Sequence, residues 1–308
     1  MKAISPSYHS PVMAPEAVSA LKLSPSGVYV DATYGGGGHS RLILDQLGPE
    51  GRVLAFDRDA DAWTNMPKDE RLLAVHHDFT FMEQFMRYAG YTRVDGILAD
   101  LGVSSHQFDT GERGFSFRYE GPLDMRMDTQ SETSAASLLA EANDKTLASI
   151  LARYGDVEHP GKVARHLVAF RNRKAIQSTA DLTEALEELV SQPSRRHKYL
   201  ARVFQALRIA VNQELEALQL LLAQSAGLLR EGGRLVVISY HSAEDRLVKQ
   251  YISTGKWQGG IDQDVYGRPM RPLKPLSRKP ITPHEDELER NPRARSARLR
   301  IAEKTMTP

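Results

Sequence analysis

Four consecutive glycines occupy positions 35–38 of the stretch VDATYGGGGHS, which runs from Val30 to Ser40. Asp31 precedes the glycines and His39 follows them at once. Because glycine leaves the backbone bare, such a loop lets a ligand come close to the main chain, or it simply permits a tight turn. No lysine follows the glycines, so a phosphate-cradling Walker loop is not predicted. The residue types indicate a ligand held by backbone groups and an acid.

Further acids stand where three downstream apolar stretches end. Asp57 lies about twenty residues past the glycines, where a carboxylate can accept two ribose hydroxyls. Asp78 and Phe79 end the next stretch, where such folds contact adenine, and Asp100 ends the last. Because ligands bind outside the carboxyl ends of the strands in an open α/β sheet, these residues predict one binding site.

The elements that must position these residues alternate along the chain. Four stretches are rich in β-branched, aromatic or apolar residues and predict strands: 27–33, 51–59, 72–79 and 94–102. Residues 40–48 predict a helix that ends at Gly48. The apolar run Ile97–Ala99 is typical of a strand buried on both faces. This alternation predicts an α/β fold with a mostly parallel sheet.

The pattern changes in the middle of the chain. Residues 104–119 are polar and glycine-rich, and residues 134–192 are helical, with Asn143 and Ser178 as expected N-caps. A long helix expected over 204–229, ended by Gly232 and Gly233, then leads back to strands at 233–242 and 296–304, with an irregular segment at 257–292. We expect a discontinuous α/β domain, residues 1–108 and 203–308, and a helical insertion, residues 109–202.

The order of Asp31, Thr33, Gly35 and Gly37 resembles the D-x-G-x-G-x-G signature of class I S-adenosylmethionine-dependent methyltransferases, with Thr33 in place of the first glycine. This resemblance implies a Rossmann-like fold and S-adenosyl-L-methionine as the cofactor. The cofactor has no phosphate, and its cationic amino group favours carboxylate or carbonyl oxygens nearby.

A longer series of motifs makes the resemblance specific. In order along the chain, the motifs are YHSPVM, YGGGGHSRLIL, DLGVSS, RGFSF, GPLDMRMD, FQALRIAVN, GGRLVVISYHSAEDRLVK and NPRARSARLRIAE. Together they resemble the RsmH (MraW) family, the bacterial 16S rRNA (cytosine(1402)-N(4))-methyltransferases, over nearly the whole chain. The resemblance implies N4-methylation of a decoding-centre cytidine, with 16S rRNA and the small ribosomal subunit as partners. The helical insertion would recognise the RNA substrate.

The resemblance implies that the positions at which the family contacts its cofactor bind it here too, and each holds a residue of the same type in this chain. These are Gly37, Gly38, His39, Asp57, Phe79, Asp100 and Gln107. The glycine loop and the strand-end acids add four further candidates for cofactor binding: Asp31, Gly35, Gly36 and Asp78.

The exocyclic amine of cytosine is a weak nucleophile because its lone pair is delocalised into the ring. An oxygen that accepts one of its N–H bonds would restore reactivity. We expect Asp100 to accept this bond or to organise the cofactor, with help from Ser104 and Ser105. His241, at the end of a later buried strand, is expected to take part as a hydrogen-bond donor, although it equally suits a satisfied core position.

The target base must leave its stack to reach such a pocket. The residues expected to receive the base or the RNA backbone are Arg113, Phe115, Phe117, Tyr240, Arg293, Arg295 and Arg298. From Arg268 to Lys304 the chain carries eleven Lys and Arg against five acids, which suits phosphate contacts. Phe115 and Phe117 equally suit the core face of a strand, and a charge run equally suits a solvated face.

The composition sets further bounds. Forty Lys and Arg against thirty-nine Asp and Glu give a net charge of +1, which by itself does not indicate a nucleic-acid-binding protein. The absence of cysteine excludes disulfides and thiolate metal sites, and no metal is predicted. Neither a signal-peptide pattern nor an apolar run near 18 residues occurs, so we expect a cytoplasmic protein without a membrane span. Monomer and homodimer both stay open.

Other functions compete with this interpretation. Only the family motifs argue against methylation of DNA or protein. A non-catalytic rRNA-binding or assembly factor should have lost loop glycines or strand-end acids, and this chain keeps them. An NAD dehydrogenase is disfavoured by Asp31 and by Ser40, which stands where G-x-G-x-x-G needs its last glycine.

Overall fold

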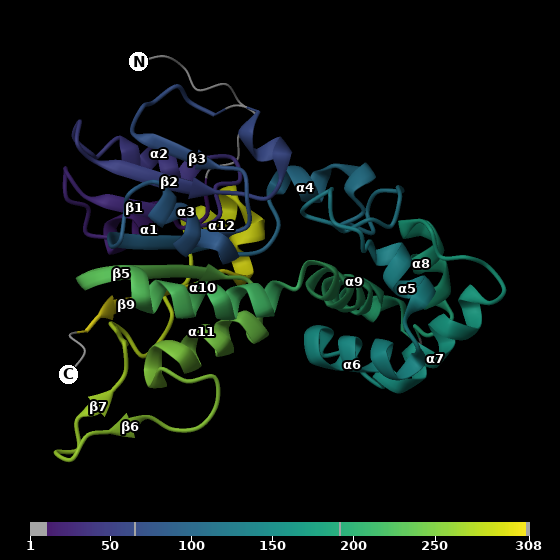
Figure 1. Cartoon of the computed structure of the whole chain (residues 1–308). Helices are drawn as coiled ribbons and strands as arrows, with labels where there is room; N and C mark the ends of the chain where they lie inside the picture. The colour runs from purple at the N-terminus through teal and green to yellow at the C-terminus, as the bar shows by residue number, and fades with distance from the viewer. Residues whose placement is uncertain (1–10, 65, 191, 306–308) are drawn as a thin grey trace. The chain divides into compact units, whose positions relative to one another are not determined.

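The computed structural model describes residues 11–64, 66–190 and 192–305, and the chain divides into two compact units (Figure 1). The sheet unit runs to Gly102 and resumes at Leu215, and the helical unit is Val103–Glu214. These limits differ from the predicted breaks at 108/109 and 202/203. Val103 and Phe108 pack against the core of the helical unit, and helix α9 (Arg196–Asn212) buries its apolar side chains there. The first three residues of the YHSPVM motif, Tyr8, His9 and Ser10, lie outside the described residues.

The sheet unit is built on seven strands in the order β3-β2-β1-β4-β5-β9-β8. Their bounds are β1 Val28–Asp31, β2 Arg52–Phe56, β3 Leu72–Val75, β4 Val94–Asp100, β5 Leu229–Ser239, β8 Leu273–Pro275 and β9 Arg298–Lys304. Strands β1 to β5 pair in parallel, whereas β9 runs antiparallel to both β5 and β8. The predicted mostly parallel α/β sheet is therefore confirmed. A separate hairpin pairs β6 (Asp262–Gln263) with β7 (Pro269–Met270).

Helices cover both faces of the sheet, so the apolar residues of its central strands β1 and β4 are buried. Alternate residues of each strand enter opposite cores: Leu54 packs with α3, α10 and α11, and Val53 packs with α1 and α2. The helices are α1 Ala14–Ala20, α2 Gly38–Leu44, α3 Met82–Tyr88, α10 Glu214–Leu228, α11 Ser242–Thr254 and α12 Glu285–Arg290. The described part of this unit also contains the short 3-10 helices η1 Ala60–Trp63, η2 Phe79–Phe81 and η5 Pro292–Ser296.

The strand order reverses at β1. The chain adds β2 and then β3 on one side of β1, and then places β4 and β5 on the other side. The carboxyl ends of β1 and β4 are Asp31 and Asp100, which therefore stand at the reversal point. Open α/β sheets bind their ligands in the crevice at such a point.

The long helix predicted over 204–229 is wrong, because the chain forms two helices there. Gln213 takes the left-handed conformation, with φ of 49°, and this ends α9 before α10 begins. Gly232 and Gly233 do not end a helix, because they lie inside β5, which begins at Leu229. The segment predicted to be irregular, 257–292, holds the β6–β7 hairpin, β8 and α12.

The helical unit packs around one apolar core. Its elements are α4 Ser105–Asp109, η3 Gly111–Arg113, α5 Ala135–Glu141, α6 Asp144–Gly155, α7 Pro160–Arg171, α8 Thr179–Glu187, η4 Pro193–Arg195 and α9. Both predicted N-caps are confirmed: Asn143 accepts from the Thr146 N–H, and Ser178 forms a capping box with Asp181. In the part of the chain that the structure describes, no helix combines the length and apolarity needed to cross a membrane.

One buried side chain fixes the GPLDMRMD segment against α9. The Asn212 amide donates to the carbonyl oxygens of Met125 (2.7 Å) and Arg208 (2.9 Å), and its oxygen accepts from the Met127 N–H at 2.8 Å. Met125 has a φ of 62°, a left-handed conformation that costs free energy in a methionine. The Asn212 bonds to the backbone on either side of Arg126 hold the chain in place directly after this strained residue.

We therefore predict that Asn212→Ala lowers the free energy of unfolding by about 1–3 kcal/mol, because buried backbone groups lose their partners. Unfolding in urea, followed by far-UV circular dichroism, measures this loss. The matched control is Asn172→Ala at the exposed C-cap of α7, which should change stability by less than about 0.5 kcal/mol. Equal stability of the two variants would contradict the role given to Asn212.

Candidate functional site

The glycine loop joins β1 to α2, and its geometry requires glycine at position 37. Gly37 has a φ of 73°, and a Cβ atom there would lie 2.5 Å from the Tyr34 hydroxyl oxygen. Tyr34 has little freedom to move away, because it is buried and its ring stacks on Trp63 with centroids 4.6 Å apart. Gly35 donates its N–H to Asp57 Oδ2 at 2.7 Å, which ties the loop to the end of β2.

Asp31 holds the glycine loop in place through two hydrogen bonds. Its buried carboxylate accepts from the Ser40 hydroxyl at 2.6 Å and from the Thr33 N–H at 3.2 Å. Burial raises the pKa of Asp31, and the neighbouring His39 opposes that shift. Both carboxylate oxygens are thus engaged within the loop and α2. The structure gives Asp31 a role in shaping the binding loop, and a direct cofactor contact at this residue stays a prediction.

Thr33, which replaces a glycine of the signature, has a specific partner. Its hydroxyl oxygen accepts the backbone N–H of Asp100 at 2.7 Å. This bond joins the end of β1 to the end of β4 across the reversal point. No local sequence pattern signals this bond, because the two residues are 67 positions apart.

Asp100 is the most constrained of the strand-end acids. Its Oδ1 accepts from the Tyr240 hydroxyl at 2.6 Å, and its Oδ2 lies 3.9 Å from His39 Nδ1. Burial raises the pKa of Asp100 to about 6, while His39 and the Tyr240 hydrogen bond act in the opposite direction. Because 21% of the side chain stays exposed, the carboxylate can still reach a ligand. The structure therefore places Asp100, His39 and Tyr240 together.

Asp57, which directly follows β2, presents a second partly desolvated carboxylate. It accepts from the N–H groups of Gly35 (2.7 Å) and Asp59 (2.8 Å). Burial raises the pKa of Asp57 to about 6, against the lowering effect of these two bonds. A carboxylate oxygen can accept more than one hydrogen bond, so Asp57 keeps capacity for a pair of hydroxyls.

The end of β3 contributes Asp78 and Phe79. The Asp78 carboxylate accepts from the Thr80 N–H at 2.8 Å, which caps η2, and it pairs with Arg58 at 3.1 Å. Phe79 is half-buried against the sheet core. Asp78 therefore orders the turn in which Phe79 stands.

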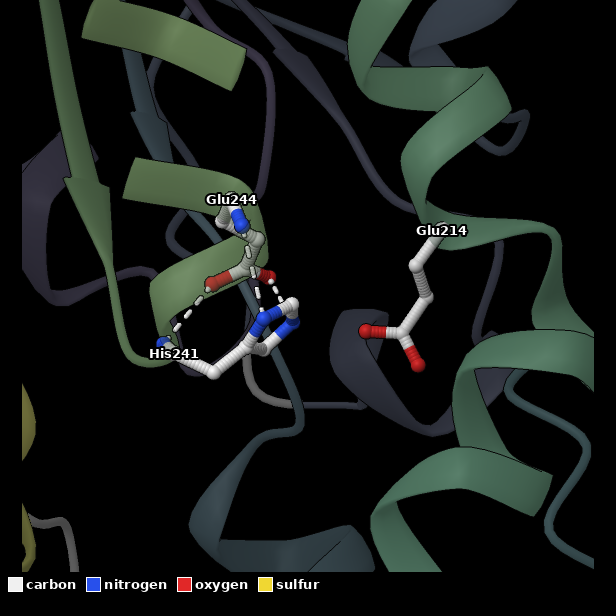
Figure 2. Close-up of side chains that lie close together, drawn as sticks. All are labelled: Glu214, His241 and Glu244. Atoms are coloured by element: carbon white, nitrogen blue, oxygen red, sulfur yellow. Dashed lines mark hydrogen bonds and ion pairs between the residues drawn. The ribbon is translucent and has the colours of Figure 1, made fainter. Parts of the chain in front are cut away.

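A tight turn, Tyr240 and His241, joins β5 to α11. Figure 2 shows His241 beside Glu244 of α11. The buried Glu244 accepts from the N–H groups of Tyr240 (2.9 Å) and His241 (3.3 Å), and His241 Nδ1 accepts the Glu244 N–H in return. His241 Nε2 is 3.1 Å from the same carboxylate but outside hydrogen-bond geometry, so that contact is electrostatic. His241 caps α11, and its predicted catalytic role stays a prediction.

Comparison with known proteins adds to this geometry. The model of a family described as the MraW methylase family matches residues 6–305. The chain belongs to the MraW methylase family. Two relatives are named Ribosomal RNA small subunit methyltransferase H. That of Parabacteroides distasonis is 48% identical over 298 residues, covering 96% of this chain and 97% of the relative. That of Cytophaga hutchinsonii is 49% identical over 300 residues, covering 96% and 99%.

The family resemblance found in the sequence is thereby confirmed, and so is the fold class, a class I methyltransferase fold with a helical insertion. Among solved structures, an rRNA methylase from Streptococcus thermophilus aligns with a TM-score of 0.42 at 10% identity. The alignment covers 98% of this chain and 100% of that one. This likeness is too slight to support any argument about function.

The helical unit of the methylase holds the remaining predicted residues of the cofactor and catalytic sets. Ser104 caps α4, since its hydroxyl accepts from the Gln107 N–H at 3.2 Å and the Gln107 side chain accepts from the Ser104 N–H at 3.0 Å. Ser105 is the first residue of α4. These bonds fix the local fold, and the cofactor and catalytic roles of the three residues stay predictions.

Two residues predicted to bind RNA lie in the core of the helical unit. Arg113 is buried and donates to the carbonyl oxygens of Arg126 (3.1 Å) and Met127 (3.0 Å). Phe115 is only 5% exposed and packs in the apolar core. Both have a structural role, and an RNA contact would require them to leave these positions. Phe117 is half-buried against the rings of His197 and Phe204.

The arginines predicted near the C-terminus differ in their surroundings. Arg293 and Arg295 are exposed in η5, which is compatible with contacts to phosphates. Arg298 lies 3.1 Å from Asp245 of α11, although about half of its side chain stays exposed. The buried Arg300, not singled out from the sequence, makes the stronger pair with Asp245, at 2.7 and 3.0 Å.

The loop geometry yields a prediction at Gly37. Gly37→Ala should lower the free energy of unfolding by at least ~1–2 kcal/mol, because alanine disfavours the left-handed conformation and its Cβ would overlap Tyr34. Urea unfolding followed by the fluorescence of the two tryptophans, Trp63 and Trp257, reports on this unit.

The control for this variant is Gly227→Ala, at an exposed helical position in α10 where a Cβ atom meets nothing within 4 Å. That change should be neutral or stabilising by roughly 0.5–1 kcal/mol. If Gly37→Ala is as stable as this control, the steric requirement at the loop is refuted.

Proposed function

We propose that this protein transfers a methyl group from S-adenosyl-L-methionine to the exocyclic amine of a cytidine in 16S rRNA. The target would be position 1402 in the decoding centre of the small ribosomal subunit, which places the reaction in the cytoplasm. Membership of a methylase family and relatives named as small-subunit rRNA methyltransferases support the reaction class. The observation that carries the proposal is the Asp100 carboxylate, held by Tyr240 at the reversal point of the sheet.

The residues around the reversal point fit this cofactor. Because Gly37 has no Cβ atom, the space beside its backbone stays free, and the cofactor can approach the main chain closely. Asp57 has acceptor capacity left for the two ribose hydroxyls, and Phe79, which follows the neighbouring strand β3, offers a ring for adenine. Asp100 supplies negative charge for the cationic amino group of the cofactor. The bound cofactor supplies an electrophilic methyl carbon, so the protein mainly has to orient the amine.

Asp100 is the proposed acceptor for the amine. Its Oδ1 is occupied by the Tyr240 hydroxyl, which leaves Oδ2 for an N–H bond of the cytosine amine. Accepting that bond would return electron density to the amine nitrogen. The new N–C bond would replace the bond between the methyl carbon and sulfur, with S-adenosylhomocysteine as the leaving group, and the carboxylate would take the proton that the amine loses. Burial raises the pKa of Tyr240 well above its ordinary value, so this hydroxyl stays protonated and keeps donating to Asp100.

The direct test is methyl transfer from labelled S-adenosylmethionine to small ribosomal subunits from cells that lack this protein. We expect one new methyl on the exocyclic amine of a single cytidine, identified by mass spectrometry of the nucleosides and mapped to position 1402. Asp100→Asn should lower kcat by roughly 100-fold or more, as loss of a proton acceptor does. Tight cofactor binding without transfer to any rRNA would instead favour a non-catalytic assembly factor.

The Asp100–Tyr240 hydrogen bond predicts a change in the pH dependence of kcat. This bond lowers the pKa of Asp100, so Tyr240→Phe should raise that pKa above about 6. Protonated Asp100 no longer accepts from the amine, and activity is lost as the pH falls through its pKa. The acid limb of the kcat profile should therefore move to higher pH in Tyr240→Phe.

The control for this prediction is Tyr251→Phe, which alters a buried tyrosine of α11 that packs in the sheet core. Its pH profile should match that of the unmodified protein. An unmoved acid limb in Tyr240→Phe would show that Asp100 does not control the reaction through its protonation.

A further inference from the structure

The segment of residues 256–279, here called the arm, follows α11, forms the β6–β7 hairpin and then returns to the sheet as β8 (Figure 1). Its base is firmly attached. The Trp257 ring stacks on Tyr251 of α11, with centroids 4.3 Å apart and planes 20° apart, and Arg271 donates to the Ser253 carbonyl oxygen at 3.0 Å. Tyr251 belongs to the sheet core, so the arm starts from a rigid support.

The tip of the arm exposes large side chains in a defined turn. Val265 is 93% exposed and Tyr266 is 81% exposed. The Asp264 carboxylate accepts from the N–H groups of Tyr266 and Arg268, each at 2.8 Å. These bonds fix the turn and hold Tyr266 outward in solvent. The Arg268 guanidinium lies over the Tyr266 ring, 5.8 Å from its centre, so a cation and an aromatic ring stand together at the tip.

The charges on the arm are strongly unbalanced. It carries six Lys and Arg against two acids. Both acids are engaged internally, Asp264 with the turn and Asp262 with Lys256 at 2.6 Å. Four exposed cations have no carboxylate within ion-pair distance among the residues that the structure describes: Arg268, Lys274, Arg278 and Lys279. The arm therefore carries uncompensated positive charge, and one of these cations, Arg268, lies against the exposed Tyr266 ring.

This combination matches single-stranded or looped RNA. Bases stack on exposed aromatic rings, and phosphates pair with arginine and lysine. An acidic protein would match the charge, but β6 and β7 span only two residues each, which offers little edge for a partner strand. We propose that the arm contacts small-subunit rRNA outside the pocket for the target cytidine. Tyr266 stacks on an unpaired base, and the four cations bind phosphates.

The identity of this RNA rests on the proposed function, so the test reads RNA affinity without turnover. Equilibrium binding to naked 16S rRNA and to small subunits is measured over a salt series. The aromatic variant is Tyr266→Ala, and its control is Tyr88→Ala, a 92% exposed tyrosine of α3. The charge variant combines Arg278→Ser with Lys279→Ser, and its control combines Lys22→Ser with Lys68→Ser, both at exposed positions. Thermal melts check that all variants fold.

Tyr266→Ala should weaken the affinity for both RNA forms roughly tenfold, which is within the usual range for a lost base stack. The charge variant should reduce the slope of log affinity against log salt by about 1.4–1.8, as expected for two lost phosphate contacts. In methylation assays KM for subunits should rise, whereas kcat and cofactor affinity stay unchanged. Both control variants should behave like the unmodified protein.

Affinities and salt slopes equal to those of the controls would overturn the proposal. A loss confined to assembled subunits, with naked rRNA bound normally, would mean that the arm contacts a ribosomal protein, which also overturns it. An unmodified protein that binds no rRNA overturns it too. If the unmodified protein binds rRNA through the arm but methylates nothing, the proposed function fails and the arm proposal stands.

Discussion

Hydrogen bonds to Asp100 join the carboxyl ends of three neighbouring strands. Its backbone N–H bonds to Thr33 after β1, and its carboxylate accepts from Tyr240 after β5. Because β1, β4 and β5 are adjacent, these two bonds fix the spacing of the crevice at the point where the strand order reverses. The glycine loop and His39 are built around the same point. A change in the position of Asp100 would therefore disturb its bonds to both Thr33 and Tyr240.

The crevice is held at a cost in stability. Burial raises the pKa of both Asp57 and Asp100 from 3.8 to about 6, so their ionised forms are disfavoured in the folded protein by roughly 3 kcal/mol each. Between pH 3.8 and about pH 6, the folded chain therefore binds more protons than the unfolded chain. Stability from these acids is therefore present below pH 3.8 and is lost as the pH rises through about 6. Partly desolvated carboxylates that ionise near neutral pH are typical of binding and catalytic sites.

The site and the arm use different physical means. Around Asp100 the polar groups are buried and bonded to each other, which fixes their orientation. On the arm, the bonds of Asp264 order only the backbone, and Tyr266 and the cations remain in solvent. Such a surface contributes affinity and salt dependence. Precision at the reacting atoms has to come from the crevice.

The sequence by itself determined the parallel α/β sheet, the glycine loop, the strand-end acids and the family. These features are local, since they depend on side-chain periodicity, on turns and on motifs within a few residues. N-caps such as Asn143 and Ser178 were predictable for the same reason.

Only the tertiary structure decided which of the candidates meet. The bonds of Thr33 and Tyr240 to Asp100 span 67 and 140 positions, so no local pattern could reveal them. Arg113 and Phe115 stand in a polar, glycine-rich stretch that suits a surface, but the core of the helical unit encloses both. Burial depends on which distant segments pack together, and a sequence pattern records only that a residue is suited to packing.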